Sequence, residues 1–414
     1  MSFTKLAAEI WRGFVTDGVA GSGVHKPIKA DIRTWGTEVE AAAGSGYASF
    51  MGMPATGTVT DDKHKALLML PADGTWITAT LDAPANLRDN FQVELFNPPY
   101  SAAGVANVRR HRIISQFETF YLAPGHSARF LKTGGAVIRI DKPSKWLKSG
   151  IVMYCDQAAS QTYFDGMVAG AGGAKKTMGA CLAVLLADID TKGDNPQIVV
   201  TGTFTENVRL NGGYESSGYV KIGAPAVNLL NWYNGAQPYC LMVANGATAI
   251  LQNVNFNRNA LANIIFLQAH QKAVVDIGDP GQGLGQSIVF AGAGATGSCL
   301  STDGAGSTIN INQGIEFGAG SYGTMIFISG ASSLNWTGST LVKHSGAVTC
   351  GTYLQMIGSG ANASLAGGID FASAGTVQPG CTKFVLALCA SLSLSGNVLP
   401  GNIAGNASSG AEYV

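Results

Sequence analysis

Two phrases in the C-terminal half of the chain nearly repeat each other: QGIEFGAGS (Gln313–Ser321) and GGIDFASAG (Gly367–Gly375). Other short apolar stretches surround both, in a recurring order of three, and successive units begin 25 to 34 residues apart. A unit this short cannot bury a core alone, so it must stack on its neighbours. The repeat therefore predicts a parallel β-solenoid with three short strands in each rung.

The repeat assigns strands to three positions in a rung. Examples of the first strand are TAILQ (Thr248–Gln252) and STINI (Ser307–Ile311). Examples of the second strand are GIEF (Gly314–Phe317) and GIDF (Gly368–Phe371), and an example of the third is TMIFISGA (Thr324–Ala331). Six first strands are recognisable, the last being SLSLS (Ser391–Ser395). Side chains alternate between the two faces of a strand, so Ile315 and Phe317 should point inward, as should Ile369 and Phe371.

Composition agrees with an all-β chain that has many tight turns. Glycine accounts for 55 of the 414 residues, and charged residues for only 13%. The formal net charge is zero, which gives no electrostatic footprint for nucleic acid. We interpret the one dense basic run, Arg109–Arg112, as a solvated turn rather than a polyanion site.

The pattern predicts a mainly β protein of five parts. Residues 1–43 carry amphipathic helical stripes, such as Phe3, Leu6 and Ile10, and form a short N-terminal helical segment. Residues 44–150 alternate as a small β-sandwich, and 151–176 form a linker. The β-helix covers 177–398, opens with a capping helix at Thr177–Asp190, and is followed by a C-terminal tail at 399–414.

Several classes of site and location are not expected. No cysteine pair or histidine pair has metal-ligand spacing, so we predict no metal and no cofactor. The seven cysteines are interpreted as small buried hydrophobes, or as bridges between subunits after release into an oxidising medium. The N-terminus lacks the pattern of a signal peptide, and no apolar run is long enough for membrane insertion.

Four segments resemble proteins of bacteriophage tails. GSGVHKPIKADIRTWGTEVE (Gly21–Glu40) resembles the virion-proximal start of tail fibres and tailspikes, and FYLAPGHSARFLKTGGAVIRI (Phe120–Ile140) is similar to the sandwich modules that follow. LADIDTKGDNPQIVVTGTFTENVRL (Leu186–Leu210) resembles the opening rung of pectate-lyase-like right-handed parallel β-helices. LPGNIAGNASSGAEYV (Leu399–Val414) is similar to tail-fibre C-termini.

The resemblance implies a homotrimer located in the virion. Its N-terminal segment would attach to other tail or neck proteins, and its β-helix would contact a bacterial surface polysaccharide or receptor. The residues that match the attachment segment are His25, Lys26, Pro27, Arg33 and Trp35.

Two carboxylates are the candidates for catalysis. Glu316 and Asp370 should point outward at matching positions of the second strand, two rungs apart, which places them about 9–10 Å from each other. That spacing is near the upper end of the range for an inverting glycosidase. The alternative is that they are solvated acids. Asp303 and Asp276 are further candidates, and His270, Lys343 and His344 are candidate acid/base partners.

Three aromatic residues are candidates for stacking on sugar rings: Trp232, Tyr233 and Trp336. The alternative is that they make core or subunit contacts.

Three functions remain open. The first is a structural tail fibre or tailspike that contacts the host, including a collar or neck fibre away from the tip. The second is a tailspike depolymerase that cleaves surface polysaccharide. The third is a free β-helical carbohydrate enzyme or surface protein of a bacterium.

Overall fold

The structure is a computed structural model of the 414-residue chain. It divides into two compact units, Met1–Ser144 and Lys145–Val414. The described residues are 49–99, 109–141, 145–147, 150–160, 164–191, 193–212, 218–224, 230–258, 264–278, 288–291, 297–337, 340–371 and 377–414. The predicted N-terminal helical segment, 1–43, lies outside them.

The first unit contains two sheets around one apolar core. The five-stranded sheet has the order β1 (Ser49–Gly52), β3 (Ala66–Met69), β5 (Gln92–Phe96), β8 (Ser127–Thr133), β9 (Ala136–Arg139). The four-stranded sheet has the order β2 (Gly57–Val59), β4 (Thr78–Leu81), β6 (His111–Ile114), β7 (Thr119–Leu122). Two short 3-10 turns, Asp61–Lys63 and Pro84–Asn86, connect strands.

Strands β1 to β6 alternate between these two sheets, and their pairings are parallel. Only the last strands, β7, β8 and β9, pair in antiparallel fashion. The basic run does not form the solvated turn that we expected. Arg110 and His111 are fully buried, and the Arg110 guanidinium lies 5.0 Å from the centre of the Tyr121 ring. A cation over an aromatic face keeps a favourable partner when it is buried.

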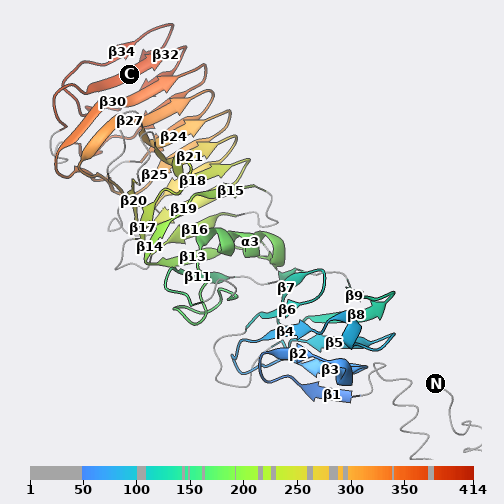
Figure 1. The fold of residues 1–414 in the computed structure, drawn as a ribbon. Coiled ribbons are helices and arrows are strands. Elements are labelled where there is room, and N and C mark those ends of the chain that lie inside the picture. The colour runs from blue at the N-terminus through green and yellow to red at the C-terminus, as the bar shows by residue number, and fades with distance from the viewer. Residues whose placement is uncertain are drawn as a thin grey trace, which may run out of the picture. The chain divides into compact units, whose positions relative to one another are not determined.

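The second unit contains three long parallel sheets, and successive segments of the chain add one strand to each in turn (Figure 1). This is a solenoid-like arrangement, as the repeat predicts. The ten-stranded sheet contains β11 (Val152–Asp156), β13 (Gln197–Thr201), β16 (Val220–Gly223), β19 (Thr248–Gln252), β22 (Val274–Ile277), β25 (Thr308–Ile311), β28 (Ser333–Trp336), β31 (Asn362–Leu365), β33 (Ser391–Ser393) and β35 (Glu412–Tyr413).

The six-stranded sheet contains β14 (Thr203–Thr205), β17 (Leu230–Tyr233), β20 (Val254–Asn257), β23 (Ile288–Ala291), β26 (Ile315–Phe317) and β29 (Val342–His344). The eight-stranded sheet contains β15 (Val208–Asn211), β18 (Tyr239–Ala244), β21 (Ile265–His270), β24 (Ser298–Asp303), β27 (Gly320–Ser329), β30 (Val348–Ile357), β32 (Thr382–Ala387) and β34 (Asn406–Ala407). A separate short pair joins β10 (Trp146–Leu147) to β12 (Ile189–Asp190).

The solenoid is longer than the repeat predicts at both ends. The predicted linker, 151–176, contains β11, which is the first strand of the ten-stranded sheet. The predicted tail, 399–414, contains β34 and β35, which pair with β32 and β33. The sequences of these terminal strands are short or differ from the repeat, so they were not recognised. Backbone pairing with the adjacent rung places them in the sheets.

The core of the solenoid contains a column of rings from successive rungs of the six-stranded sheet. Trp232, Phe256, Phe290, Phe317 and His344 occupy one register position. Neighbouring ring centres in this column lie 5.4 to 5.9 Å apart. Offset stacking at these distances adds to the stabilisation from burial.

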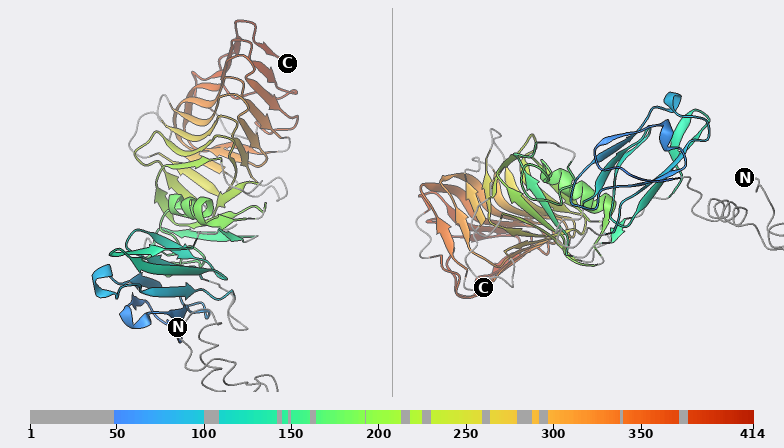
Figure 2. Two further views of the ribbon diagram at one scale, coloured as in Figure 1. Left: turned by 90° about the vertical axis from the view of Figure 1, so that its right-hand side faces the viewer. Right: turned by 90° about the horizontal axis from the view of Figure 1, so that it is seen from below.

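The one helix among the described residues, α3 (Met178–Asp188), lies where the chain enters this stack of rungs (Figure 2). It begins after Thr177, whose side-chain oxygen accepts a hydrogen bond from the Ala180 N–H at 3.1 Å. Its buried face contacts β11, β12, β13 and β15. The helix therefore covers apolar surface at the first rungs, as the predicted cap should.

Three of the seven cysteines are not simple buried hydrophobes. Cys350 and Cys381 form a disulfide within the chain, between adjacent rungs of the eight-stranded sheet, with their Cα atoms 5.1 Å apart. Cys155, Cys181, Cys240 and Cys299 are free and buried, as expected, whereas Cys389 is free and exposed.

Candidate functional site

Glu316 lies on the outer side of β26, partly exposed, between the buried Ile315 and Phe317. The hydroxyl of Ser345, one rung further on, donates a hydrogen bond to its Oε1 at 2.5 Å. The residue beside Glu316 in the register of the next strand is Lys343. The alternation predicted for this strand is therefore correct, and the neighbour of the acid on the next rung is a cation.

Asp370 is partly exposed, as predicted, but it does not occupy the register position of Glu316. Its bridge partner is Leu341, whereas Glu316 pairs with Lys343, two residues later on the same strand. Two rungs plus a shift of two residues along the strand place the two positions about 12 Å apart. The expectation that the two acids share a register position is therefore wrong, and their backbone positions lie farther apart than the 9–10 Å that we expected.

The register changes on both sides of β29, because Glu316 lies opposite Lys343 on one side and Asp370 bridges Leu341 on the other. In the structure Val342 pairs with Ile315, is fully buried, and leaves Lys343 on the outer side. The loops between strands vary in length, so similarity of phrases alone does not determine which residues pair.

The aromatic candidates separate into core and surface. Trp232 is fully buried, and its indole N–H donates to the Glu206 carbonyl at 2.9 Å. Trp336 is 1% exposed and donates to Thr340 Oγ1 at 2.8 Å. Their burial contradicts the expectation that they stack on sugar rings and supports the core alternative. Tyr233 is partly exposed on the opposite face of β17.

One acid/base pair does come together, from the further candidates. His270 Nδ1 and Asp303 Oδ2 lie 3.2 Å apart on adjacent rungs of the eight-stranded sheet. The hydroxyl of Ser329, on the next rung, donates to Asp303 Oδ1 at 3.1 Å. Both ionisable side chains are partly exposed, and they lie at the carboxyl ends of their strands. His344 is buried in the ring column and is remote from this pair in register.

A further candidate site lies at the C-terminal end of the solenoid, and we name it the C-terminal cleft. It is a hollow of about 590 Å³. Its apolar lining comes from Ile369, Phe371, Val377, Val398, Leu399 and Pro400, and its polar lining from Asp370, Lys383, Asn397 and Asn402. A cavity of this size suits a small ligand.

The cleft exists because the three sheets end at different places. The six-stranded sheet ends at β29, apart from the single bridge between Leu341 and Asp370, while the other two sheets continue to β34 and β35. In the last rung the loop after β33 takes the place of a strand of the six-stranded sheet. Asn397 fixes the start of this loop, because its Nδ2 donates to the Ala366 and Leu394 carbonyls at 2.9 and 2.7 Å.

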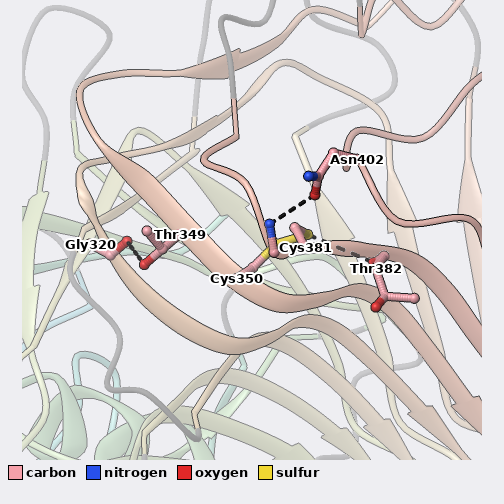
Figure 3. Close-up of a disulfide and its surroundings, with 7 residues drawn as sticks. Gly320, Thr349, Cys350, Cys381, Thr382 and Asn402 are labelled. Atoms are coloured by element: carbon pink, nitrogen blue, oxygen red, sulfur yellow. Dashed lines mark hydrogen bonds between the residues drawn. A yellow bond between two sulfur atoms is a disulfide. The ribbon is translucent and has the colours of Figure 1, made fainter.

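The disulfide lies beside Asn402, one of the residues that line the cleft (Figure 3). The backbone N–H groups of Asn402 and Ile403 both donate to the Cys381 carbonyl at 3.1 Å. The side-chain oxygen of Asn402 accepts a hydrogen bond from the Gly380 N–H at 2.8 Å. Cys381 is itself bonded to Cys350 on the preceding rung, so these hydrogen bonds join the loop to a segment that is cross-linked to the body of the solenoid.

Sequence reasoning missed Lys383, Asn397, Asn402 and the disulfide as parts of a site. The available signal was Lys383, a lysine near the start of a third strand whose counterparts in other units are apolar or small.

The predicted attachment residues His25, Lys26, Pro27, Arg33 and Trp35 lie outside the described residues. Across the described residues no group of three or more His, Cys, Asp or Glu side chains could hold a metal ion. Within the same residues, no helix has the length and hydropathy needed to cross a membrane.

Comparison with known proteins identifies no relative: no protein-family model, no curated protein and no solved structure matches the chain.

Proposed function

We propose that the chain is a structural protein of a tailed bacteriophage, a tail fibre or tailspike that contacts a polysaccharide of the bacterial surface. In this proposal the three sheets close into a right-handed parallel β-helix, and three copies associate. Residues 1–43 form a helical segment that attaches the trimer to another tail or neck protein. The support for these parts is the resemblance of the sequence motifs together with the solenoid-like order of the strands.

The outer face of the ten-stranded sheet supports a binding role. Asn310 donates to Asp276 at 2.6 Å, and Asn335 donates to Asn310 at 2.8 Å, so a ladder of short polar side chains crosses three rungs. Thr308 and Ser333 make a parallel contact at 2.9 Å. A face rich in amide and hydroxyl groups, with few charges, has the hydrogen-bonding capacity that neutral sugar hydroxyls require.

The observation that favours binding of a polysaccharide over its cleavage is the register of Asp370, which bridges Leu341. Glu316 and Asp370 do not share a register position, and Lys343 occupies the rung between them. A surface that holds a polysaccharide without cutting it needs no such pair.

The test uses the full-length chain and a panel of purified bacterial surface polysaccharides. We expect the labelled protein to bind at least one of them, and the bound polymer to keep its length during incubation. Binding to none of a panel drawn from the bacterium that supports the phage, or absence of the chain from purified virions, would overturn the proposal.

Depolymerisation is the second candidate, and the contact between His270 and Asp303 favours it. An imidazole and a carboxylate 3.2 Å apart supply the residue types of a general acid/base pair, and both are partly exposed. Shortening of a bound polysaccharide that is lost in His270→Gln and kept in Glu316→Gln would establish cleavage at this pair. If the polymer keeps its length, binding without cleavage explains the function better than depolymerisation does.

A further inference from the structure

The inner face of the eight-stranded sheet carries a row of side chains that ends in a lysine. Cys240, Phe266, Cys299, Met325 and Tyr353 occupy one position in consecutive rungs, between flanking residues that are in register. All five are fully buried. In the next rung Thr352 pairs with Thr382 and Leu354 with Phe384, so the counterpart of Tyr353 is Lys383.

A lysine at this position needs a polar environment or a partner. Burial of an unpaired ammonium group in an apolar core is strongly unfavourable, and the preceding member of the row shows how apolar this core is. Burial raises the pKa of Tyr353 well above its usual range. Lys383 avoids that environment because it is partly exposed and lines the C-terminal cleft.

The cleft brings together three kinds of group. Lys383 supplies an ammonium donor, Asp370 a carboxylate acceptor, and Ile369, Phe371 and Leu399 an apolar surface. A pyranose ring offers an apolar C–H face and hydroxyl donors, and an acidic sugar adds a carboxylate. Charge-assisted hydrogen bonds between ammonium and carboxylate are among the stronger polar contacts.

We propose that the C-terminal cleft binds a carboxylated sugar residue, with Lys383 holding the sugar carboxylate and Asp370 accepting hydrogen bonds from ring hydroxyls. This inference rests on the proposed contact with a surface polysaccharide, and it names the class of that polysaccharide as acidic. The volume of about 590 Å³ accommodates one ring and part of its neighbours in the polymer.

The rim of the cleft is ordered before any ligand arrives. The hydrogen bonds of Asn397 and Asn402 fix the loop that forms one wall, and Asn402 bonds to the segment that carries the disulfide. A preformed site loses less conformational freedom on binding, which favours recognition of a single weakly binding sugar residue.

The experiment compares glucuronate with glucose, which differ only at C6, by ligand-observed NMR on the full-length protein. We expect glucuronate to bind at least about tenfold more tightly than glucose, and this preference to weaken at high ionic strength. Lys383→Gln should abolish the preference and Lys383→Arg should retain most of it. The matched control is Lys343→Gln, because Lys343 is exposed on the outer side of β29 and does not line the cleft.

Equal binding of the two sugars, no binding of either, or an unchanged preference in a folded Lys383→Gln protein would overturn the inference. Circular dichroism and thermal melting establish that the variants are folded. If Lys383→Gln does not fold, the salt dependence of the parent protein decides, and a preference that salt does not alter contradicts the role of the ammonium.

The two proposals fail in different ways. If the parent protein and Lys383→Gln bind an acidic surface polysaccharide equally well, the cleft is not the contact site and the proposed function stands. If the parent binds glucuronate but no surface polysaccharide, the cleft binds acidic sugars and the proposed function falls.

Discussion

At the residue scale, neighbouring aromatic side chains on β17 have opposite roles. Trp232 is fully buried in the ring column, and Tyr233 is partly exposed on the other face. Trp232→Ala should lower the free energy of unfolding by about 3–5 kcal/mol, because it leaves a cavity between stacked rings. Tyr233→Ala should cost less than about 1 kcal/mol. Denaturant unfolding measures both, and similar losses would contradict the assignment of faces.

A second residue-scale prediction concerns Gly223 on β16. A Cβ added there would lie 2.1 Å from the backbone oxygen of Gln252 on the next rung, so the strand ladder would have to open. Gly223→Ala should destabilise the protein by about 1–3 kcal/mol, as overpacking generally does. Gly172 is the control, because a Cβ there meets nothing within 4 Å. Gly172→Ala should leave the midpoint of denaturation nearly unchanged.

At the element scale, the N-terminus of α3 donates hydrogen bonds to Glu206, an acid between β14 and β15 whose pKa is raised. Glu206 accepts hydrogen bonds from the Met178 and Gly179 N–H groups at 2.8 and 3.4 Å. Burial raises the pKa of Glu206 above its ordinary value of 4.5, and these two donors partly oppose the effect. The folded state therefore favours the protonated acid.

Because the pKa of Glu206 is higher in the folded than in the unfolded state, the stability of the protein falls as this acid ionises. The contribution of Glu206 to stability is fully present below pH 4.5 and is lost as the pH rises through the raised pKa of the folded state. Glu206→Gln, which cannot ionise, should remove this loss. Urea unfolding in steps from pH 4.5 to neutral should show that the parent loses stability relative to the variant. A constant difference between them would contradict the raised pKa.

The disulfide is the second prediction at this scale. Cys350 and Cys381 are 31 residues apart, and their bond restricts the unfolded chain. Replacement of both by serine should reduce the free energy of unfolding by about 2–4 kcal/mol. A reducing agent should have the same effect on the parent and none on the double variant. Cys389→Ser serves as the control, because Cys389 is exposed and free. Equal stability of parent and double variant would contradict the prediction.

The strands of the central rungs could be predicted from the sequence because apolar alternation and turn residues are local signals. TAILQ coincides with β19, and the predicted first strands from Thr248 onward all belong to the ten-stranded sheet. Which residues face each other across rungs is not a local property. The offset in register between Glu316 and Asp370, which lie on either side of β29, depends on loop lengths and core packing that the repeated phrase does not reveal.

The candidate site was less predictable for a related reason. Asp370 could be selected as a partly exposed acid, but the cleft beside it arises from the unequal ends of three sheets. Lys383 becomes notable only when its register with Tyr353 is known. The disulfide likewise depends on the stacking of two adjacent rungs.

At the scale of the whole molecule, the chain has a solenoid-like unit and a separate two-sheet unit. We propose that three copies of it associate. The two units have separate cores. The outer face of the ten-stranded sheet is rich in Asn, Ser and Thr side chains, which suits an exposed surface on an assembled particle.

The native mass of the purified full-length protein, measured by multi-angle light scattering, tests the central claim most directly. A trimer of the 42.7 kDa chain should give about 128 kDa, independent of dilution over the accessible range. That result would support the fibre or tailspike assignment. A stable monomer of 42.7 kDa would contradict it, and would favour instead a single-chain β-helical protein that acts on carbohydrate.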